Sequence, residues 1–147
     1  MKNMVLLIDA NVIISYITNR NPGFAEAYQI MDCCREGRAK GFIAFHTVSI
    51  LWYVLRKKPK FERRSILLSL CELFTVTGAS HQDVVDAVTS DDFSDFEDCL
   101  QEKCAENVGA DYIVTEKIRD FKTSKVPAAT PADMLAILSS KKNDSPT

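Results

Sequence analysis

Short apolar runs, separated by longer segments, recur along the whole chain and predict β-strands. These strands are expected at residues 4–8, 41–45, 74–76 and 111–114, with a short fifth one near residue 128. The segments between them carry apolar residues at helical spacing; for example, Phe96, Leu100 and Cys104 share one face of a helix. Strands that alternate with helices are typical of an α/β fold whose parallel sheet is covered on both faces.

The helix ends carry recognisable starting signals. Ser80 is followed three residues later by Asp83, and Thr130 precedes Pro131, which is the usual chemistry of a helix N-terminus. The pattern as a whole predicts helices over residues 9–17, 24–35, 46–57, 59–70, 80–88, 95–107 and 131–138. Residues 117–126 read as a basic loop.

Composition limits the class of protein. The chain has 147 residues, 46% of them hydrophobic and 26% charged, which suits one ordinary domain. We assign residues 1–138 to that domain and residues 139–147 to a polar tail. No apolar run is long enough to span a membrane, and Asp9 interrupts the N-terminal run early, so we expect a cytoplasmic protein with no membrane partner. Five cysteines without a C-x-x-C pair, and only two histidines, argue against a structural zinc site.

The net charge of −2 excludes a bulk positive field, but the charges are unevenly distributed. Residues 56–64 hold six bases against the single acid Glu62, whereas residues 83–98 hold seven acids and no base. Each segment reads first as a solvated face. The functional alternative is a basic rim beside an acidic pocket.

Carboxylates are the best candidates for chemistry, because phosphate-binding glycine loops are absent and a histidine-based triad has weak support from two histidines outside any nucleophile motif. Asp9 directly follows the first predicted strand, and Thr115 and Glu116 follow the fourth. Asp98 lies in the first turns of a helix, and Asp120 lies in the loop after Glu116. Gathered at the carboxyl edge of a parallel sheet, these acids would repel one another unless a hard cation such as Mg²⁺ or Mn²⁺ bound there. The competing interpretation is that they only cap helices and order a loop.

Four segments, in order, resemble the PIN-domain ribonucleases. Residues 6–12 (LLIDANV) look like the family's opening motif, and residues 95–101 (DFEDCLQ) are similar to its DFEDALQ stretch. Residues 109–115 (GADYIVT) with Asp120-Phe121 resemble GADYIVTRNIKDF, and residues 127–135 resemble the closing pattern. The resemblance implies a three-layer α/β/α sandwich with a central parallel sheet and Mg²⁺- or Mn²⁺-dependent cleavage of single-stranded RNA. It also implies a VapC-like toxin with an antitoxin partner and a homodimeric state.

Site residues follow from the resemblance position by position. Asp9, Asp98 and Asp120 match three of the family's acids, which implies catalytic and metal-binding roles. Thr115 matches its hydroxyl position and Asn11 a polar position near the first acid. The chain departs from the family at two places: Ile50 stands where an acid is usual, and Lys117 stands where an asparagine is usual. Glu97 or Glu116 could compensate. Substrate phosphates would be contacted by Lys117, Arg119, Lys122 and Lys125.

Two functions therefore remain open. The first is a metal-dependent endoribonuclease that cleaves single-stranded RNA, either as the toxin of a toxin–antitoxin pair or on its own. The second is a catalytically weakened PIN-fold module that binds RNA or a protein. A phospho-accepting receiver domain, a third class, would need an acceptor Asp after the third strand, and residues 75–77 (TVT) supply none.

Overall fold

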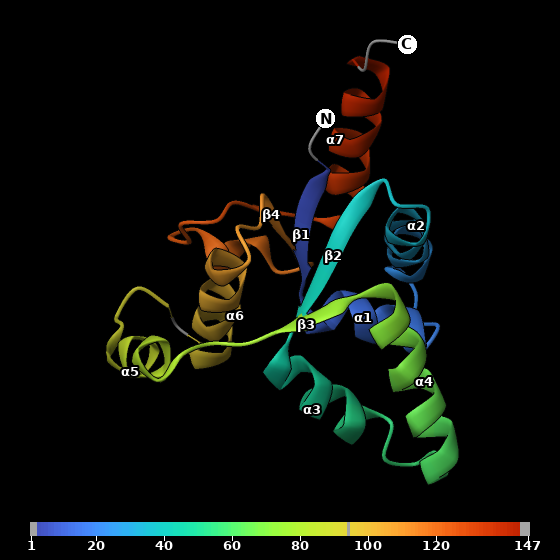
Figure 1. The fold of residues 1–147 in the computed structure, drawn as a ribbon, viewed down its shortest axis with the longest axis horizontal. Helices are drawn as coiled ribbons and strands as arrows, with labels where there is room; N and C mark the ends of the chain where they lie inside the picture. The colour runs from blue at the N-terminus through green and yellow to red at the C-terminus, as the bar shows by residue number, and fades with distance from the viewer. Residues whose placement is uncertain (1–2, 94, 145–147) are drawn as a thin grey trace.

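The computed structural model describes residues 3–93 and 95–144, which form a parallel five-stranded sheet flanked by helices (Figure 1). The strand order is β3-β2-β1-β4-β5. The strands are β1 (Met4–Ile8), β2 (Ala39–Ala44), β3 (Thr75–Thr77), β4 (Tyr112–Val114) and β5 (Ala128–Ala129). Because β1 pairs in parallel with both β2 and β4, the order of the strands reverses direction at β1. Ligand sites of open α/β sheets lie at such a switch point.

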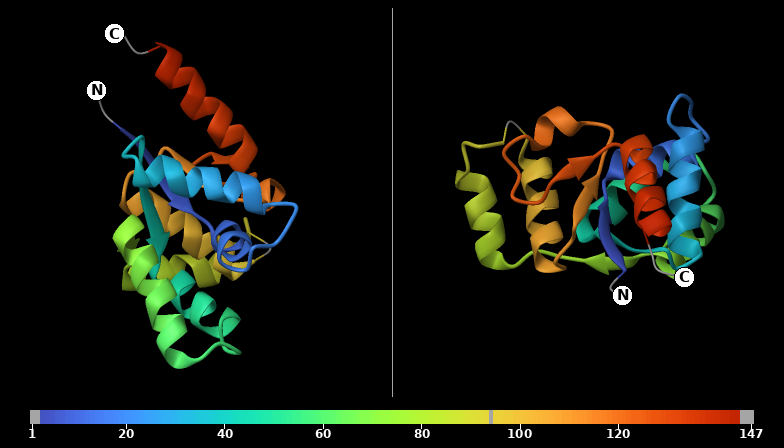
Figure 2. Two further views of the ribbon diagram at one scale, coloured as in Figure 1. Left: turned by 90° about the vertical axis from the view of Figure 1, so that its right-hand side faces the viewer. Right: turned by 90° about the horizontal axis from the view of Figure 1, so that it is seen from above.

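Helices cover both faces of the sheet, as predicted, so the fold has three layers (Figure 2). In chain order the helices are α1 (Ala10–Ile17), α2 (Phe24–Arg35), α3 (Phe45–Val54), α4 (Lys60–Leu73), α5 (His81–Thr89), α6 (Phe96–Asn107), the 3₁₀ helix η1 (Ile118–Phe121) and α7 (Pro131–Asp144). Helices α1, α2 and α7 contact one another on one side, while α6 packs against β1 and β4 on the other.

The core divides along β1 because successive strand side chains point to opposite faces. Leu6 and Ile8 belong to the larger apolar cluster, which includes residues of α1, α2 and α7. Leu7 belongs to a second cluster with residues of α6 and η1. All three side chains are fully buried. This two-sided burial explains the uninterrupted apolar run in the sequence.

Local chemistry starts several helices where the sequence predicts. Ser80 and Asp83 form a capping box, in which Ser80 Oγ accepts from Asp83 N at 3.0 Å. Asp95 caps α6, and Thr130 Oγ1 accepts from Asp133 N at the start of α7. The five cysteines are free; Cys33, Cys99 and Cys104 are buried, whereas Cys71 is exposed.

The boundaries differ from the prediction at several places. The sequence predicts that Phe45 ends a strand, but Phe45 is the first residue of α3. Strand β2 begins earlier than predicted, at Ala39, and ends at Ala44. The predicted basic loop contains η1. Helix α7 runs on to Asp144 rather than ending near Leu138, since the polar residues beyond Leu138 include no helix breaker. Within the described residues, no helix is both long and apolar enough to cross a bilayer.

Candidate functional site

Asp9 lies at the carboxyl end of β1 and receives hydrogen bonds on both carboxylate oxygens. Oδ1 accepts from Ala10 N at 2.8 Å and from Gln101 Nε2 at 3.1 Å. Oδ2 accepts from Thr115 Oγ1 at 2.8 Å and from Asn11 Nδ2 at 3.2 Å. Strand β4 is next to β1, so the prediction that Asp9 and Thr115 emerge at the same edge is confirmed. Burial raises the pKa of Asp9, and these hydrogen bonds oppose the rise.

Gln101 and Thr47 belong to this network although the sequence analysis assigned them no role. Gln101 Nε2 also donates to Thr47 Oγ1 at 3.1 Å, and both side chains are almost fully buried. The amide thus links α6 and α3 to the carboxylate that ends β1. One sequence signal could have found it: Gln101 follows Asp98 by three residues and therefore lies on the same helical face.

Asp98 is the most perturbed acid of the site. It is 6% exposed, and its Oδ2 is buried without a hydrogen-bond partner among the described residues. Burial, followed by the charges of Asp9, Asp95 and Asp120, raises the pKa of Asp98 to about 7, and Lys117 opposes the rise. Asp98 therefore has an unused oxygen ligand close to other carboxylates.

Asp120 and Lys117 lie at the rim. Asp120 is half-buried in η1, where its charge contributes to the raised pKa of Asp98. Lys117 is exposed, and its N–H donates to Thr115 Oγ1 at 3.0 Å. The structure therefore brings three predicted acids into one electrostatic group and places a cation beside them.

His46 joins this group from the first turn of α3. Burial lowers the pKa of His46, while the charges of Glu97 and Asp9 oppose the change. Its Nε2 is buried and has no partner in the described part of the chain. Glu97 is exposed on α6, and its charge acts on the pKa of His46.

Glu116 contacts the network through its main chain. Its N–H donates to Asn11 Oδ1 at 3.2 Å, whereas its carboxylate accepts from Ser15 Oγ at 3.4 Å and approaches Gly23. The remaining predicted substrate contacts, Arg119, Lys122 and Lys125, are exposed. Lys125 is held beside α6 because its N–H donates to Glu102 Oε2 at 2.8 Å.

Ile50 occupies the side of α3 that faces the site. It follows His46 by four residues and Thr47 by three, so the three share one helical face. Ile50 is half-buried, and within the described residues the apolar clusters take in Val48 and Leu51 of α3 but not Ile50. It therefore supplies an apolar side chain where the family resemblance implies an acid.

The donors suit a hard divalent cation in chemical type, since carboxylate oxygens predominate and Asp98 Oδ2 is buried and unpaired. Among the described residues, however, no three His, Cys, Asp or Glu side chains stand close enough to share one ion. Asp9 is fully engaged in hydrogen bonds, and Asp120 is at the rim. Binding would require these side chains to move closer to Asp98.

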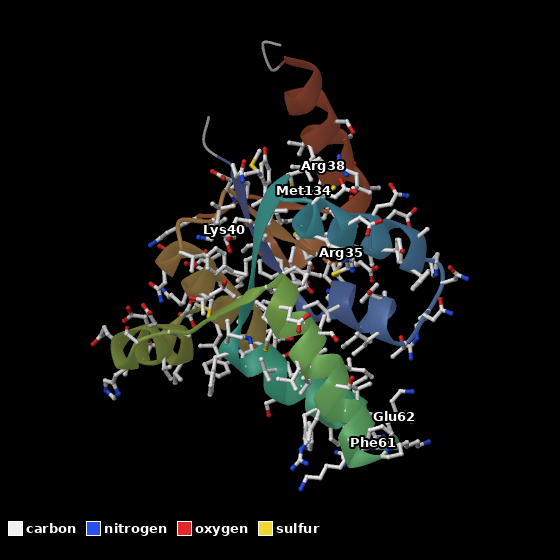
Figure 3. The ribbon with its side chains drawn as sticks, turned by 45° about the vertical axis from the view of Figure 1, so that its right-hand side comes forward. Arg35, Arg38, Lys40, Phe61, Glu62 and Met134 are labelled. Atoms are coloured by element: carbon white, nitrogen blue, oxygen red, sulfur yellow. The ribbon has the colours of Figure 1, made fainter. Side chains whose placement is uncertain are left out.

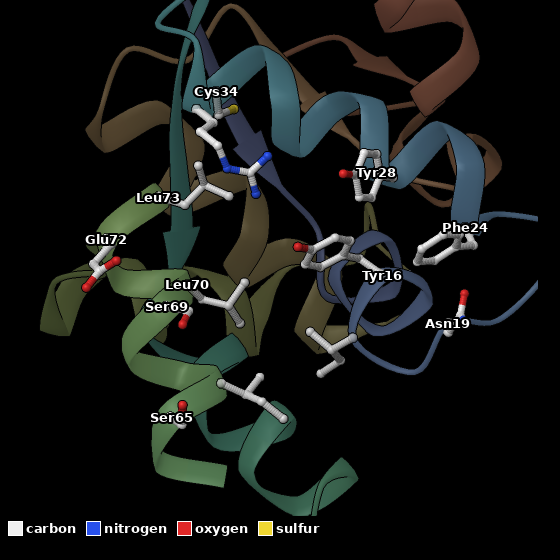
Figure 4. Close-up of a pocket in the computed structure, with 13 residues that line it drawn as sticks. Tyr16, Asn19, Phe24, Tyr28, Cys34, Ser65, Ser69, Leu70, Glu72 and Leu73 are labelled. Carbon is white, nitrogen blue, oxygen red and sulfur yellow. The ribbon is translucent and has the colours of Figure 1, made fainter. Parts of the chain in front are cut away.

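A groove of about 790 Å³ lies between α1, α2 and α4, separate from the carboxylates (Figure 4). Three aromatic side chains line it: Tyr16 stacks on Phe24 with ring centroids 6.3 Å apart, and Tyr28 packs against both. Leu70 and Leu73 of α4 form the opposite wall. The groove therefore combines aromatic and aliphatic walls with hydroxyl groups and the charged side chains of Arg35 and Glu72.

Known proteins resemble this chain in sequence and in fold. The sequence model described as PIN domain matches residues 5–119. No relative was found by sequence among curated proteins. The fold is similar to a chain of VapBC2 from Rickettsia felis, solved bound to a promoter DNA fragment, with a TM-score of 0.65 and 16% identity over 86% of this chain and 98% of that one.

Two further solved structures have the same fold at low identity. DNA-bound VapBC from Salmonella typhimurium matches with a TM-score of 0.62 and 15% identity, over 87% of this chain and 98% of that one. Mycobacterium tuberculosis VapC20, described as a sarcin-ricin loop cleaving toxin, matches with a TM-score of 0.57 and 12% identity, over 74% and 86%. Since the sequence match covers most of the chain, this protein belongs to the PIN domain family.

Proposed function

We propose that this chain is a divalent-metal-dependent endoribonuclease that cleaves single-stranded RNA in the cytoplasm. The observation that carries the proposal is Asp98, a buried carboxyl whose pKa is raised to about 7 and whose Oδ2 is unpaired beside Asp9. A buried carboxyl group with a raised pKa, close to the switch point of a parallel sheet, is typical of a functional site. Membership of the PIN domain family and the fold shared with VapC20 support the same conclusion.

Asp9, Asp98 and Asp120 would hold Mg²⁺ or Mn²⁺, which when bound supplies Lewis acidity and activates water for attack on a phosphodiester. The chain's own contribution is orientation. Asn11, Thr115 and Gln101 fix the plane of the Asp9 carboxylate through hydrogen bonds. Asp98 offers the free oxygen, and in its protonated form at lower pH it would be a poor ligand.

Phosphate contacts would come from the exposed loop after β4. Lys117 is the cation whose positive charge opposes the rise in the pKa of both Asp9 and Asp98. Arg119, Lys122 and Lys125 extend the same basic surface. These cations would position the RNA backbone without reading its bases.

We further propose that the protein is the toxin of a toxin–antitoxin pair and forms a homodimer. The VapBC neighbours are solved as complexes, which supports a protein partner here. The aromatic groove of Tyr16, Phe24 and Tyr28 is the surface that suits an apolar helical segment of an antitoxin. Helices α1, α2 and α4 line this groove, whereas the proposed RNA contacts lie in the loop after β4.

A catalytically weakened module that binds RNA or a protein is the alternative. Two observations favour it: Ile50 supplies no ligand, and Asp9 is saturated by hydrogen bonds from the protein itself. Both would weaken the hold on a cation and the alignment of the attacking water. The two functions share a fold and differ in rate.

A cleavage assay on single-stranded RNA, with Mn²⁺, Mg²⁺ or a chelator, tests the proposal. We expect slow, metal-dependent cleavage that disappears in Asp98→Asn. The same metals should raise the melting temperature of the wild type by an amount that grows with their concentration, because only the folded site binds them. Cleavage that survives both the chelator and Asp98→Asn would contradict the proposal. Metal binding without cleavage would favour the module.

A further inference from the structure

The turn between α3 and α4 carries a concentrated positive charge that the proposed site does not use. We call residues 56–64 the basic tip; its bases are Arg56, Lys57, Lys58, Lys60, Arg63 and Arg64. All except Arg63 are exposed. Among the described residues the tip's acid, Glu62, pairs with Lys58 at 3.9 Å. The remaining cations repel one another across a short turn, and a polyanion would relieve that repulsion.

Aromatic rings are interleaved with these cations. The Arg56 guanidinium lies 4.2 Å from the centre of the Tyr53 ring, and Arg63 lies 4.2 Å from that of Trp52. Tyr53 is 64% exposed and Phe61 71% exposed. Exposed rings and stacked guanidinium planes beside cations are the surface on which unpaired bases stack.

An exposed stripe along α3 runs to the tip from the first turn of the helix, the turn that also carries Thr47 of the carboxylate network. Phe45, Ser49, Tyr53 and Arg56 are all exposed and recur at helical spacing, so they share one face. Phe45 opens the helix next to His46 and Thr47, whereas Tyr53 and Arg56 reach the tip. The two rings are separated by about 12 Å along the axis, and the whole helix is about 15 Å long. A strand of a few nucleotides would span it.

The opposite side of the molecule repels a polyanion. Helix α5 carries Asp83 and Asp86, and it lies at the far end of the molecule from the α3–α4 turn (Figure 1). The field of the protein therefore favours one path for RNA across the site, towards α4 and away from α5.

We propose that the basic tip holds the flank of a single-stranded RNA that runs along α3 from the carboxylate site. The inference rests on the proposed function and specifies how that site takes its substrate. A single strand fits better than a duplex, because the exposed rings of Tyr53 and Phe61 can stack on unpaired bases only. An acidic protein would meet the same charge but would leave the aligned rings of α3 unused.

The test is the binding of a labelled RNA of about 12 nucleotides, measured by fluorescence anisotropy over a range of salt concentrations without added metal. Lys57→Gln/Lys60→Gln/Arg64→Gln removes three tip charges. The matched control is Arg35→Gln/Arg38→Gln/Lys40→Gln, which removes three charges near the amino end of β2, at the opposite end of the molecule from Phe61 and Glu62 (Figure 3). Tyr53→Ser tests stacking, with Tyr28→Ser of the aromatic groove as its control.

We expect the triple tip variant to flatten the slope of log K against log salt by about 2, because each phosphate contact on a single strand contributes roughly 0.7. Tyr53→Ser should weaken binding about tenfold with little change in slope. Both control variants should bind as the wild type does.

Equal binding by the tip variant and its control would overturn the inference. If the tip variant bound RNA normally but lost binding of a polyglutamate peptide, the surface would belong to an acidic protein partner. If Tyr53→Ser bound RNA normally but no longer formed a dimer, the surface would belong to a second copy of the chain. Either result would also overturn the inference. Cleavage of the same RNA with Mn²⁺ is scored separately. Tip-dependent binding without any cleavage would support this surface and contradict the proposed function.

Discussion

Gln101 Nε2 donates a hydrogen bond to Asp9 Oδ1 at 3.1 Å, from a side chain that is only 1% exposed. The same nitrogen donates to Thr47 Oγ1, so one amide joins α6, α3 and the end of β1. Asp98 lies one turn earlier on α6. The neutral amide of Gln101 therefore helps to fix the position of Asp9 relative to Asp98.

Gln101→Leu keeps the size of this side chain and removes both donated hydrogen bonds. We expect the free energy of unfolding to fall by about 1 kcal/mol, because Asp9 Oδ1 and Thr47 lose a buried partner. Part of the cost is offset, since Gln101 Oε1 is itself buried and unpaired. Urea denaturation measures the change. Gln82→Leu, which breaks an exposed bond to Asp86, is the control and should alter stability little. Equal effects of the two substitutions would mean that Gln101 does not support Asp9.

Ile50→Glu should restore an oxygen ligand on the face of α3 next to Thr47. We expect tighter Mn²⁺ binding and cleavage faster by on the order of tenfold to a hundredfold, because better alignment of the reacting groups has effects of that size. Because Ile50 is half-buried, a glutamate there could destabilise the fold, so the melting temperature of the variant is measured together with its cleavage rate. Ala136→Glu places the same charge on an exposed position of α7, outside both proposed surfaces, and should change neither. A folded Ile50→Glu protein with wild-type affinity and rate would show that this position does not face the metal.

Asp98→Asn should stabilise the protein in a pH-dependent way. The folded pKa of about 7 exceeds the ordinary value of 3.8, so the folded state holds its proton more tightly than the unfolded state does. The contribution of Asp98 to stability is therefore greatest below pH 4 and falls as the pH rises to 7, by up to about 1.4 kcal/mol per pH unit. The stability of Asp98→Asn relative to the wild type should therefore increase from pH 4 to pH 7 and then level off. Thermal melts from pH 4 to pH 9 measure it, and a constant difference would contradict the raised pKa.

The same carboxyl should make metal binding depend on pH. A proton on Asp98 competes with the cation, so the rise in melting temperature with Mn²⁺ should increase from pH 6 to pH 8. Calorimetric titration in two buffers of different ionisation enthalpy would detect the released proton. Binding that is equally strong at both pH values would exclude Asp98 as a ligand.

Neutralising Lys117, Lys122 and Lys125 to glutamine should weaken RNA binding without altering sequence preference. Three lost phosphate contacts would flatten the salt dependence by about 2 in the logarithmic slope. The assay compares RNAs of equal length and different sequence. A changed order of preference among them would show that these side chains contact bases.

The sequence was sufficient for the sheet and for the first carboxylate contact. Parallel strands bring their carboxyl ends to one edge, so the meeting of Asp9 with Thr115 followed from two strand assignments. The starts of α5, α6 and α7 followed from side chains that cap locally. These features depend on neighbours in sequence or on the period of a strand.

The network around Gln101 was not predicted, because it depends on how α3 and α6 pack across the sheet edge. A glutamine or threonine on a helix gives no sign of whether it faces water or a buried acid. The length of α7 was also missed, since its last polar residues are compatible with either a helix or a tail. The direction of Glu116, towards Ser15, depends on the loop before α2 rather than on its position after β4.

Because β1 lies at the centre of the sheet and pairs with β4, the carboxylate site can assemble only late in the synthesis of the chain. Asp9 is among the first residues made, but Thr115, which donates to it, comes more than a hundred residues later along the chain. Strand β4 pairs with β1 over the same separation, and Asp98 and Asp120 flank it. A nascent chain can fold β1 with β2 early, yet its carboxylates stay apart until nearly the whole sequence has left the ribosome. Truncated products of interrupted translation therefore lack the assembled carboxylate site.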